Sequence, residues 1–318
     1  MTAAPEIRAA DAAPRTTPGW LPLAAVGVTL VLWASAFVAI RHLAGDFSAG
    51  ALSLGRLLVG SLCLGVVALL TSRGRESVRP TRGEWVSIVT IGVLWFGIYN
   101  VALNAGEQHV DAGTAVMLIQ VSPVLIALLA ATFLHEPFTL YLGLGLALAF
   151  AGVGLIATAS GDSGGDRSVL GVALCLVAAV AYSISLVLQK PLMARLSALH
   201  VTGLACTVGA VVCLPFAGQL LDDARAASGP DLWWVVYLGV FPTAIAFTTY
   251  AYALRTMTAS SLGVTTYLVP PITILMGWLF LGETPPTMAY AGGALALVGV
   301  AVARRKPRTM ADQPQAPA

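Results

Sequence analysis

The sequence predicts an all-α polytopic membrane protein, with ten transmembrane helices arranged as two inverted five-helix repeats. Three observations support this. Only 10% of the 318 residues are charged and 58% are hydrophobic, whereas soluble domains carry about 25% charged residues. The charges divide the chain into ten long uncharged stretches, and a bilayer core requires about 20 apolar residues per helix. The third observation is an internal repeat, described below.

The uncharged stretches are apolar along their whole length, which favours helices over the alternating pattern of a membrane β-barrel. The first five predicted spans cover residues 20–40, 49–71, 85–106, 112–134 and 138–158. The second five cover residues 169–189, 199–220, 232–254, 259–282 and 286–303. The predicted organisation is a tail (1–19), a first repeat (20–158), a polar linker (159–168), a second repeat (169–304) and a tail (305–318).

The distribution of Lys and Arg predicts the orientation, because cytoplasmic connections carry the excess of these residues. With the N-terminus inside, thirteen of the 17 basic residues lie in cytoplasmic segments. The outer segments hold only Arg41, Arg167 and Arg225, and Arg56 lies within the second span. Both termini are therefore expected in the cytoplasm, and 159–168 on the outside.

The internal repeat appears when the chain is compared with itself at an offset of 147 residues. Eleven of the 31 positions from 123 to 153 are then identical, and the spacing from a proline to a Phe-Leu-x-Glu motif is preserved. An offset of 149 aligns Trp33 with Tyr182 and Arg41 with Lys190. Because five helices is an odd number, the second repeat must enter the membrane inverted. Such repeats are typical of transporters that work by alternating access, with the substrate held near the midplane.

Particular segments carry a family resemblance. The runs VLWASAFVAI, LSLGRLLVG, SPVLIALLAATFLHEP and VPPITILMGWLFLGET resemble the EamA domains of the drug/metabolite transporter superfamily. The resemblance covers about residues 20–304 as two tandem domains. It implies ten helices, cytoplasmic termini, and transport, often export, of amino acids or other small metabolites.

Acidic residues are absent from the middle of every predicted span. The small multidrug-resistance proteins, a distantly similar branch, use a membrane-embedded Glu in the first helix for proton-coupled efflux of cations. Residues 31–40 hold no acid here. We therefore expect neither an intramembrane carboxylate relay nor lipophilic-cation antiport, and the coupling ion is left open.

Arg56 is the only full charge inside a predicted span. An intramembrane charge usually faces a cavity or a partner, because its burial in lipid costs roughly 2.5 kcal/mol or more. Arg56 is therefore a candidate to bind a substrate carboxylate. The alternative is a structural role, in which it snorkels toward the outer interface or binds backbone carbonyls.

Uncharged polar and aromatic residues are the other candidates for a midplane substrate site. Asn100 with Asn104, and Thr248 with Tyr252, are pairs four residues apart in the third helix of each half, so each pair shares a helix face. Gln120 and Tyr267 each lie three residues before a paired proline, where the backbone is expected to bend. The candidates are Trp33, Asn100, Asn104, Gln120, Tyr182, Thr248, Tyr252 and Tyr267, with Pro123 and Pro270 bending the fourth helices. The alternative is that these side chains only bond neighbouring helices.

Four charged residues at span ends are related by the repeat: Arg41 with Lys190, and Glu136 with Glu283. The two acids precede the fifth helix of each half, where the positive helix end favours them, so a structural role is the first expectation. The alternative is that all four are gate charges.

Other functions lack their motifs. The four histidines form no HExxH, the four cysteines form no CxxC, and no nucleotide-binding loop or hydrolase motif is present, so no metal, cofactor or enzymatic activity is expected. A net charge of +2 gives no reason to expect a nucleic-acid partner.

The expected partners are a small-molecule substrate and the lipid bilayer, and a monomer is compatible with the sequence. The predicted function is a secondary transporter, exporting amino acids or related metabolites across a bacterial plasma membrane. The alternatives are a transporter of drug-like molecules or nucleotide sugars, and a non-transporting sensor or lipid-modifying enzyme.

Overall fold

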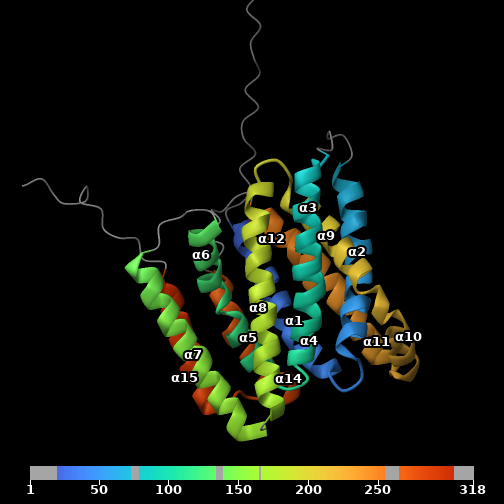
Figure 1. The fold of residues 1–318 in the computed structure, drawn as a ribbon. Helices are drawn as coiled ribbons and strands as arrows, with labels where there is room; N and C mark the ends of the chain where they lie inside the picture. Colours follow the sequence, from blue (N-terminus) through green and yellow to red (C-terminus); the bar gives the residue numbers. More distant parts are fainter. Residues whose placement is uncertain (1–19, 73–78, 134–138, 165, 255–264, 304–318) are drawn as a thin grey trace, which may run out of the picture.

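The computed structural model describes residues 20–72, 79–133, 139–164, 166–254 and 265–303, where all regular structure is helical. The first half contains α1 (Trp20–Leu43), α2 (Ala49–Ser72), α3 (Arg82–Ile91), the π-helix η1 (Gly92–Tyr99), α4 (Asn100–Gly106), α5 (Ala112–Ile119), α6 (Ser122–Phe133) and α7 (Leu140–Gly164). The second half contains α8 (Asp166–Leu192), α9 (Ala198–Val212), η2 (Leu214–Phe216), α10 (Ala217–Ala226), α11 (Gly229–Leu238), the π-helix η3 (Gly239–Ile245), α12 (Ala246–Leu254), η4 (Thr266–Leu268), α14 (Val269–Leu281) and α15 (Thr287–Ala303). They form one bundle (Figure 1).

The apolar segments of the described chain correspond to the predicted spans. Six are long and apolar enough to cross a membrane: Trp20–Leu43, Ala49–Thr71, Arg82–Gly106, Ala112–Phe133, Val169–Leu192 and Gly229–Ala253. Another is bent by 49° between α9 and η2, and three shorter apolar helices are Leu140–Ile156, Thr266–Leu281 and Thr287–Val302. The all-α polytopic fold is confirmed, while the count of ten crossings stays a prediction. Residues 259–264, which begin the ninth predicted span, lie outside the described residues.

The polar segment 159–168, predicted as a linker, is largely helical in the described residues. Helix α7 continues to Gly164 and α8 begins at Asp166, so helix ends form most of this segment. Helical N–H groups bond to the carbonyl four residues earlier whatever the polarity of the side chains, and each glycine weakens the helix by only about 1 kcal/mol. A polar, glycine-rich composition therefore marked the end of the apolar span without ending the helix.

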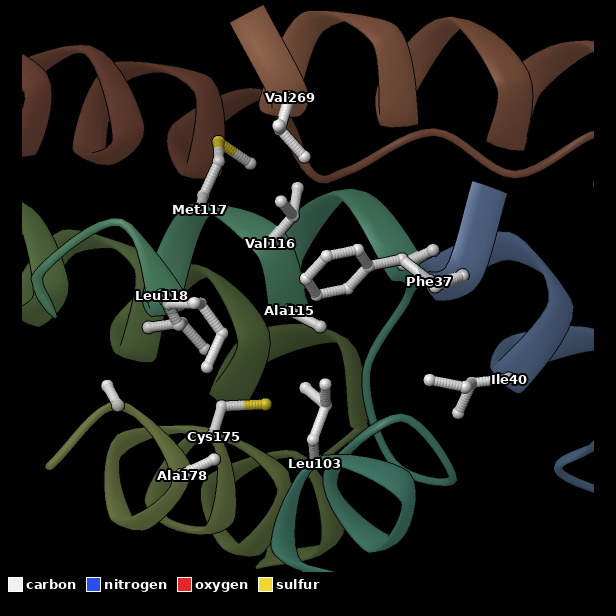
Figure 2. Packing of buried hydrophobic residues seen from close by; sticks show 14 of the residues in the cluster. Phe37, Ile40, Leu103, Ala115, Val116, Met117, Leu118, Cys175, Ala178 and Val269 are labelled. Carbon is white, nitrogen blue, oxygen red and sulfur yellow. The ribbon is translucent and has the colours of Figure 1, made fainter. Parts of the chain in front are cut away.

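The core joins the two halves. Phe37 on α1, Leu103 on α4, Leu118 on α5, Cys175 on α8 and Val269 on α14 belong to one cluster of buried residues (Figure 2). First-half and second-half helices are thus packed together rather than as separate five-helix bodies. This packing places the interface of the repeats at the centre of the molecule.

Helices α7 and α15 pack along each other (Figure 1), and glycines lie at their contact. A Cβ atom on Gly299 would lie 2.6 Å from the carbonyl oxygen of Gly145, and one on Gly152 would meet the carbonyl oxygen of Gly292. Gly152 and Gly299 are 147 residues apart, as are Gly145 and Gly292. The two copies therefore use equivalent positions against each other, as membrane helices do when small residues let their backbones approach.

A second pair of contacts repeats in the same way. A Cβ atom on Gly92 of η1 would lie 2.5 Å from Cβ of Val208 on α9, and one on Gly239 of η3 would lie 2.5 Å from Cβ of Val59 on α2. The glycines are 147 residues apart and the valines 149. Each second helix thus packs against the third helix of the other half, which is the contact pattern of two interlocked copies.

Gly152→Ala is expected to destabilise the protein by about 1–3 kcal/mol, because its new methyl group would overlap backbone atoms of α15 that cannot move aside. Gly154→Ala on the same helix is the matched control. A Cβ there meets nothing within 4 Å, so stability should hold or rise through better helix propensity. Thermal unfolding of both purified variants measures the difference. Equal melting temperatures would contradict the close approach of α7 and α15.

Candidate functional site

A cavity of about 250 Å³ lies between the two halves. Its walls come from α1, α2, η1 and α4 to α6 of the first half and from α8, η3, α12, η4 and α14 of the second. Of the residues that the sequence indicated, the lining includes Trp33, Arg56, Asn100, Gln120, Pro123 and Tyr182. The site therefore lies at the interface of the two repeats, where transporters built from such repeats hold their substrates.

Arg56 on α2 is only 9% exposed. Its Nη2 donates to Oγ1 of Thr243 on η3, 3.3 Å away, and within the described chain its buried Nε has no partner. A guanidinium has five N–H donors, and a buried cation is normally paired with an acid. Arg56 lines the cavity without a described acidic partner.

Gln120 lies at the break between α5 and α6, where residues 120 and 121 belong to neither helix. Pro123 has no N–H to donate to the carbonyl oxygen four residues earlier. Just before it, the N–H of Val121 bonds to the carbonyl oxygen of Leu118, three residues back rather than four. Gln120 lines the cavity, and its buried Nε2 has no partner among the described residues. The cavity thus has a second group able to donate to an oxygen atom.

The third helix of each half contains a π-helix, which was not predicted from the sequence. Directly after η1, Nδ2 of Asn100 donates to the carbonyl oxygens of Trp95 (3.2 Å) and Phe96 (3.0 Å) within η1. In η3, Oγ1 of Thr243 donates to the carbonyl oxygen of Leu238, 2.8 Å away. Such π-helical turns often occur at functional sites. Here each brings a polar side chain to the cavity wall.

A network of aromatic rings forms much of the wall, and most of these rings were missed. Trp95 packs against Tyr182 with ring centroids 5.2 Å apart and against Phe247 at 5.5 Å. Trp33 lies 5.2 Å from Tyr250, and Tyr99 also lines the cavity. The signal was present in the sequence as the aromatic-rich runs WFGIY (95–99) and FTTYAY (247–252).

Several other candidates do not line the cavity. Asn104 instead joins α4 to α2, because its Nδ2 donates to Oγ of Ser53, 2.9 Å away, and to the carbonyl oxygen of Ala49. The hydroxyl of Thr248 donates to the carbonyl oxygen of Ala244, one turn earlier at the end of η3. The remaining candidates outside the lining are Tyr252, Tyr267 and Pro270. A shared helix face was thus too coarse a guide, because only part of each face meets the cavity.

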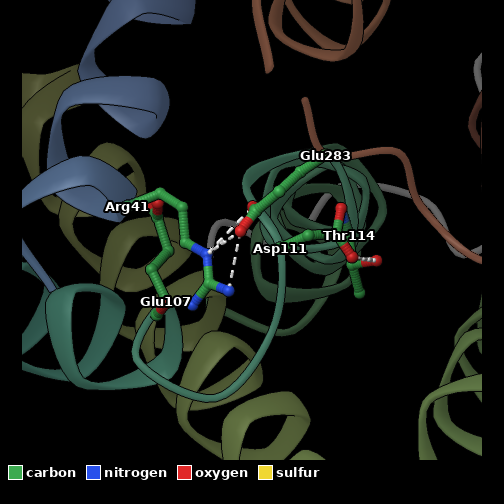
Figure 3. Close-up of polar contacts among 5 residues, drawn as sticks. All are labelled: Arg41, Glu107, Asp111, Thr114 and Glu283. Carbon is green, nitrogen blue, oxygen red and sulfur yellow. Dashed lines mark hydrogen bonds and ion pairs between the residues drawn. The ribbon is translucent and has the colours of Figure 1, made fainter. Parts of the chain in front are cut away.

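Arg41 and Glu283 form an ion pair between the two halves at one end of the bundle (Figure 3). Nε of Arg41 lies 3.0 Å from both carboxylate oxygens of Glu283, and its Nη2 lies 2.9 Å from Oε1. Nη1 of Arg41 also donates to the backbone carbonyl oxygen of Glu107, 2.8 Å away. Arg41 therefore ties the end of α1 both to the α14–α15 connection and to the end of α4.

The repeat mates of this pair are Lys190 and Glu136. Lys190 lies near the end of α8, while Glu136 lies outside the described residues. At the same end of the bundle as Lys190, Arg195 pairs with Glu84 at the start of α3, with Nη1 and Oε1 3.1 Å apart.

Glu107 is a buried acid that lies between two predicted spans and was not among the predicted site residues. It follows α4 directly, is 0% exposed, and both its carboxyl oxygens are buried without a described hydrogen-bond partner. The only feature of the sequence that could have indicated Glu107 was its position, because it comes immediately after an apolar span.

Residues 20–158 and 169–305 each match the EamA-like transporter family. A relative from Streptantibioticus cattleyicolor, named "Probable terminal-alkyne amino-acid exporter", is 37% identical over 283 residues, covering 89% of this chain and 93% of that protein. "Uncharacterized transporter YdfC" of Bacillus subtilis is 32% identical over 269 residues, covering 85% and 86%. A solved structure described as "Crystal structure of protein" has a TM-score of 0.61 at 21% identity, covering 89% of this chain and 96% of that one. This last likeness concerns the fold alone.

Proposed function

Because this chain belongs to the EamA-like transporter family, we propose that it exports carboxylate-bearing small metabolites, amino acids in particular, across a bacterial plasma membrane. The relative from Streptantibioticus cattleyicolor, which is named as an amino-acid exporter, supports this substrate class. The cavity supports it independently, through the chemistry of its walls.

The main support for the proposal is the position of Arg56. It is a buried cation on a membrane helix, it lines the cavity, and the described chain gives it one hydroxyl acceptor and no carboxylate. Gln120 adds an N–H donor without an acceptor. Unsatisfied buried donors are costly, so a ligand carboxylate between these side chains would remove that cost. The aromatic walls would cover the apolar part of the same ligand.

The proposed orientation places both termini in the cytoplasm, following the excess of basic residues in the segments predicted there. The Arg41–Glu283 pair then lies at the outer end of the bundle, and Lys190, the repeat mate of Arg41, lies at the inner end. We propose that the Arg41–Glu283 pair closes the outer end, so that the cavity opens to one side at a time.

Transport from proteoliposomes tests the proposal. Vesicles loaded with labelled amino acids are expected to release them faster when they contain the protein. An apolar or aromatic amino acid should compete, whereas its carboxamide, which has the same shape without the negative charge, should compete poorly. Equal competition by acid and amide would contradict carboxylate recognition. Absence of protein-dependent flux across all amino-acid pools would contradict the substrate class.

A further inference from the structure

Glu107 occupies an unusual position for an acidic side chain. It lies between α4 and α5, outside the apolar span that ends at Gly106, yet it is fully buried. Its backbone is well held, because its N–H bonds to the carbonyl oxygen of Leu103 (2.9 Å) and its carbonyl oxygen accepts from Arg41. Its carboxyl group has no hydrogen-bond partner within the described chain.

The charged and titratable groups around Glu107 come from every neighbouring element. They are Arg41 on α1, Arg56 on α2, Tyr99 on η1, His109 and Asp111 on its own connection, Cys175 on α8, and Glu283 on the α14–α15 connection.

Two of these charged side chains, Arg41 and Asp111, have their own side-chain partners. The side chain of Arg41 is held by Glu283. Oδ1 of Asp111 accepts from the N–H of Thr114 (2.8 Å) and its Oδ2 from the Thr114 hydroxyl (2.6 Å), which caps α5 (Figure 3). No described cation therefore contacts the Glu107 carboxyl group.

An ionised carboxylate in this position would be a buried charge without a partner, which is far more costly than a buried neutral acid. Burial raises the pKa of Glu107 well above its ordinary value, and the positive charges of Arg41 and Arg56 offset only part of this effect. The packing around Glu107 thus favours the protonated acid over the ionised carboxylate.

The opening of the proposed outer end must disturb this environment. Arg41 donates both to the backbone of Glu107 and to the carboxylate of Glu283, so the two halves cannot separate there without breaking one of these contacts. Water that enters between α1 and the α14–α15 connection would surround Arg41 and Glu283, whose charges act on Glu107. In water, a glutamate is ionised above a pH of about 4.3.

We propose that Glu107 is a proton-binding site of the outer end, which takes up one proton from the external solution when that end closes and returns it when the end opens. This inference rests on the proposed transport cycle for its direction, because an exporter must close its outer end to return for the next substrate. Protonation converts the carboxylate to a neutral carboxylic acid and requires no other reactant. The external pH therefore sets how readily the empty transporter returns.

The transport test varies the pH outside uniformly oriented proteoliposomes at constant internal pH. In the wild type, net efflux is expected to fall as the external pH rises, by at most about tenfold per pH unit, the limit for one proton. Glu107→Gln, a neutral isostere of the protonated acid, should make efflux independent of external pH. Glu107→Asp retains an ionisable group and should retain the dependence. Asp222→Asn, at an exposed acid on α10, is the matched control and should behave as the wild type.

A second readout does not depend on transport. The infrared spectrum of the purified wild type at neutral pH should contain the C=O stretching band of a protonated carboxylic acid, and this band should disappear in Glu107→Gln but remain in Asp222→Asn. Gel filtration establishes that each variant is folded. A wild type without this band, or a band that persists in Glu107→Gln, would overturn the proton site. If the band behaves as expected but no amino acid is transported, the substrate proposal fails and the proton site stands.

Discussion

Replacing Arg56 with alanine is expected to weaken the binding of an amino-acid substrate about thirtyfold or more. Removing one partner of a buried, hydrogen-bonded charge pair typically costs at least about 2 kcal/mol, and each 1.4 kcal/mol is a factor of ten in Kd. Arg56→Lys should recover only part of the affinity, because an ammonium cannot make the two parallel hydrogen bonds of a guanidinium. Titration calorimetry with purified protein measures the Kd of each variant.

The same variant separates substrate binding from a structural role. In the ligand-free protein Arg56 is a buried cation without a described acidic partner, so its removal should leave the melting temperature unchanged or higher. A structural Arg56 would instead lower the melting temperature and leave the affinity unchanged. Thr71→Ala, at the exposed end of the same helix, is the control and should change neither quantity.

The fold was largely predictable because membranes impose a simple rule on sequence. Backbone groups must be satisfied within each span, so long apolar stretches could be assigned as helices without knowledge of their partners. The 147-residue offset then related positions such as Gly152 and Gly299, which the structure places in equivalent contacts. The π-helices η1 and η3 were not predictable in this way, because they depend on local hydrogen bonds such as that from Thr243 to Leu238.

The candidate site was predictable only in part. Arg56 and Gln120 stood out because a polar residue in an apolar span requires an explanation. Phe247 and Tyr250 did not, since an aromatic residue in such a span fits equally well against lipid, another helix or a cavity. Glu107 was missed for the opposite reason: an acid at a span end is ordinary, and only the packing of distant segments over it makes it unusual.

Reversing either charge of the Arg41–Glu283 pair is expected to reduce transport at least about tenfold. Reversing both charges in one variant is expected to restore much of the lost transport. Arg41→Glu places two carboxylates where an ion pair now joins the halves, and Glu283→Arg places two cations there. Like charges at this distance repel, which disfavours closure of that end. The double variant regains attraction across the same gap. Recovery should be incomplete, because a glutamate at position 41 cannot donate to the Glu107 carbonyl as Arg41 does.

The two side chains are 27% and 33% exposed, and pairs this accessible to water contribute little to folding stability. All three variants are therefore expected to fold with melting temperatures close to the wild type, so that a loss of transport reports on closure rather than on unfolding. Reversal of both charges of the Arg225–Asp222 pair, which lies within α10 alone, is the matched control and should leave transport intact. If the double variant at positions 41 and 283 were folded but as inactive as the single variants, attraction between the two halves would not be what closes this end. Full activity of the single variants would show that the pair is not a gate.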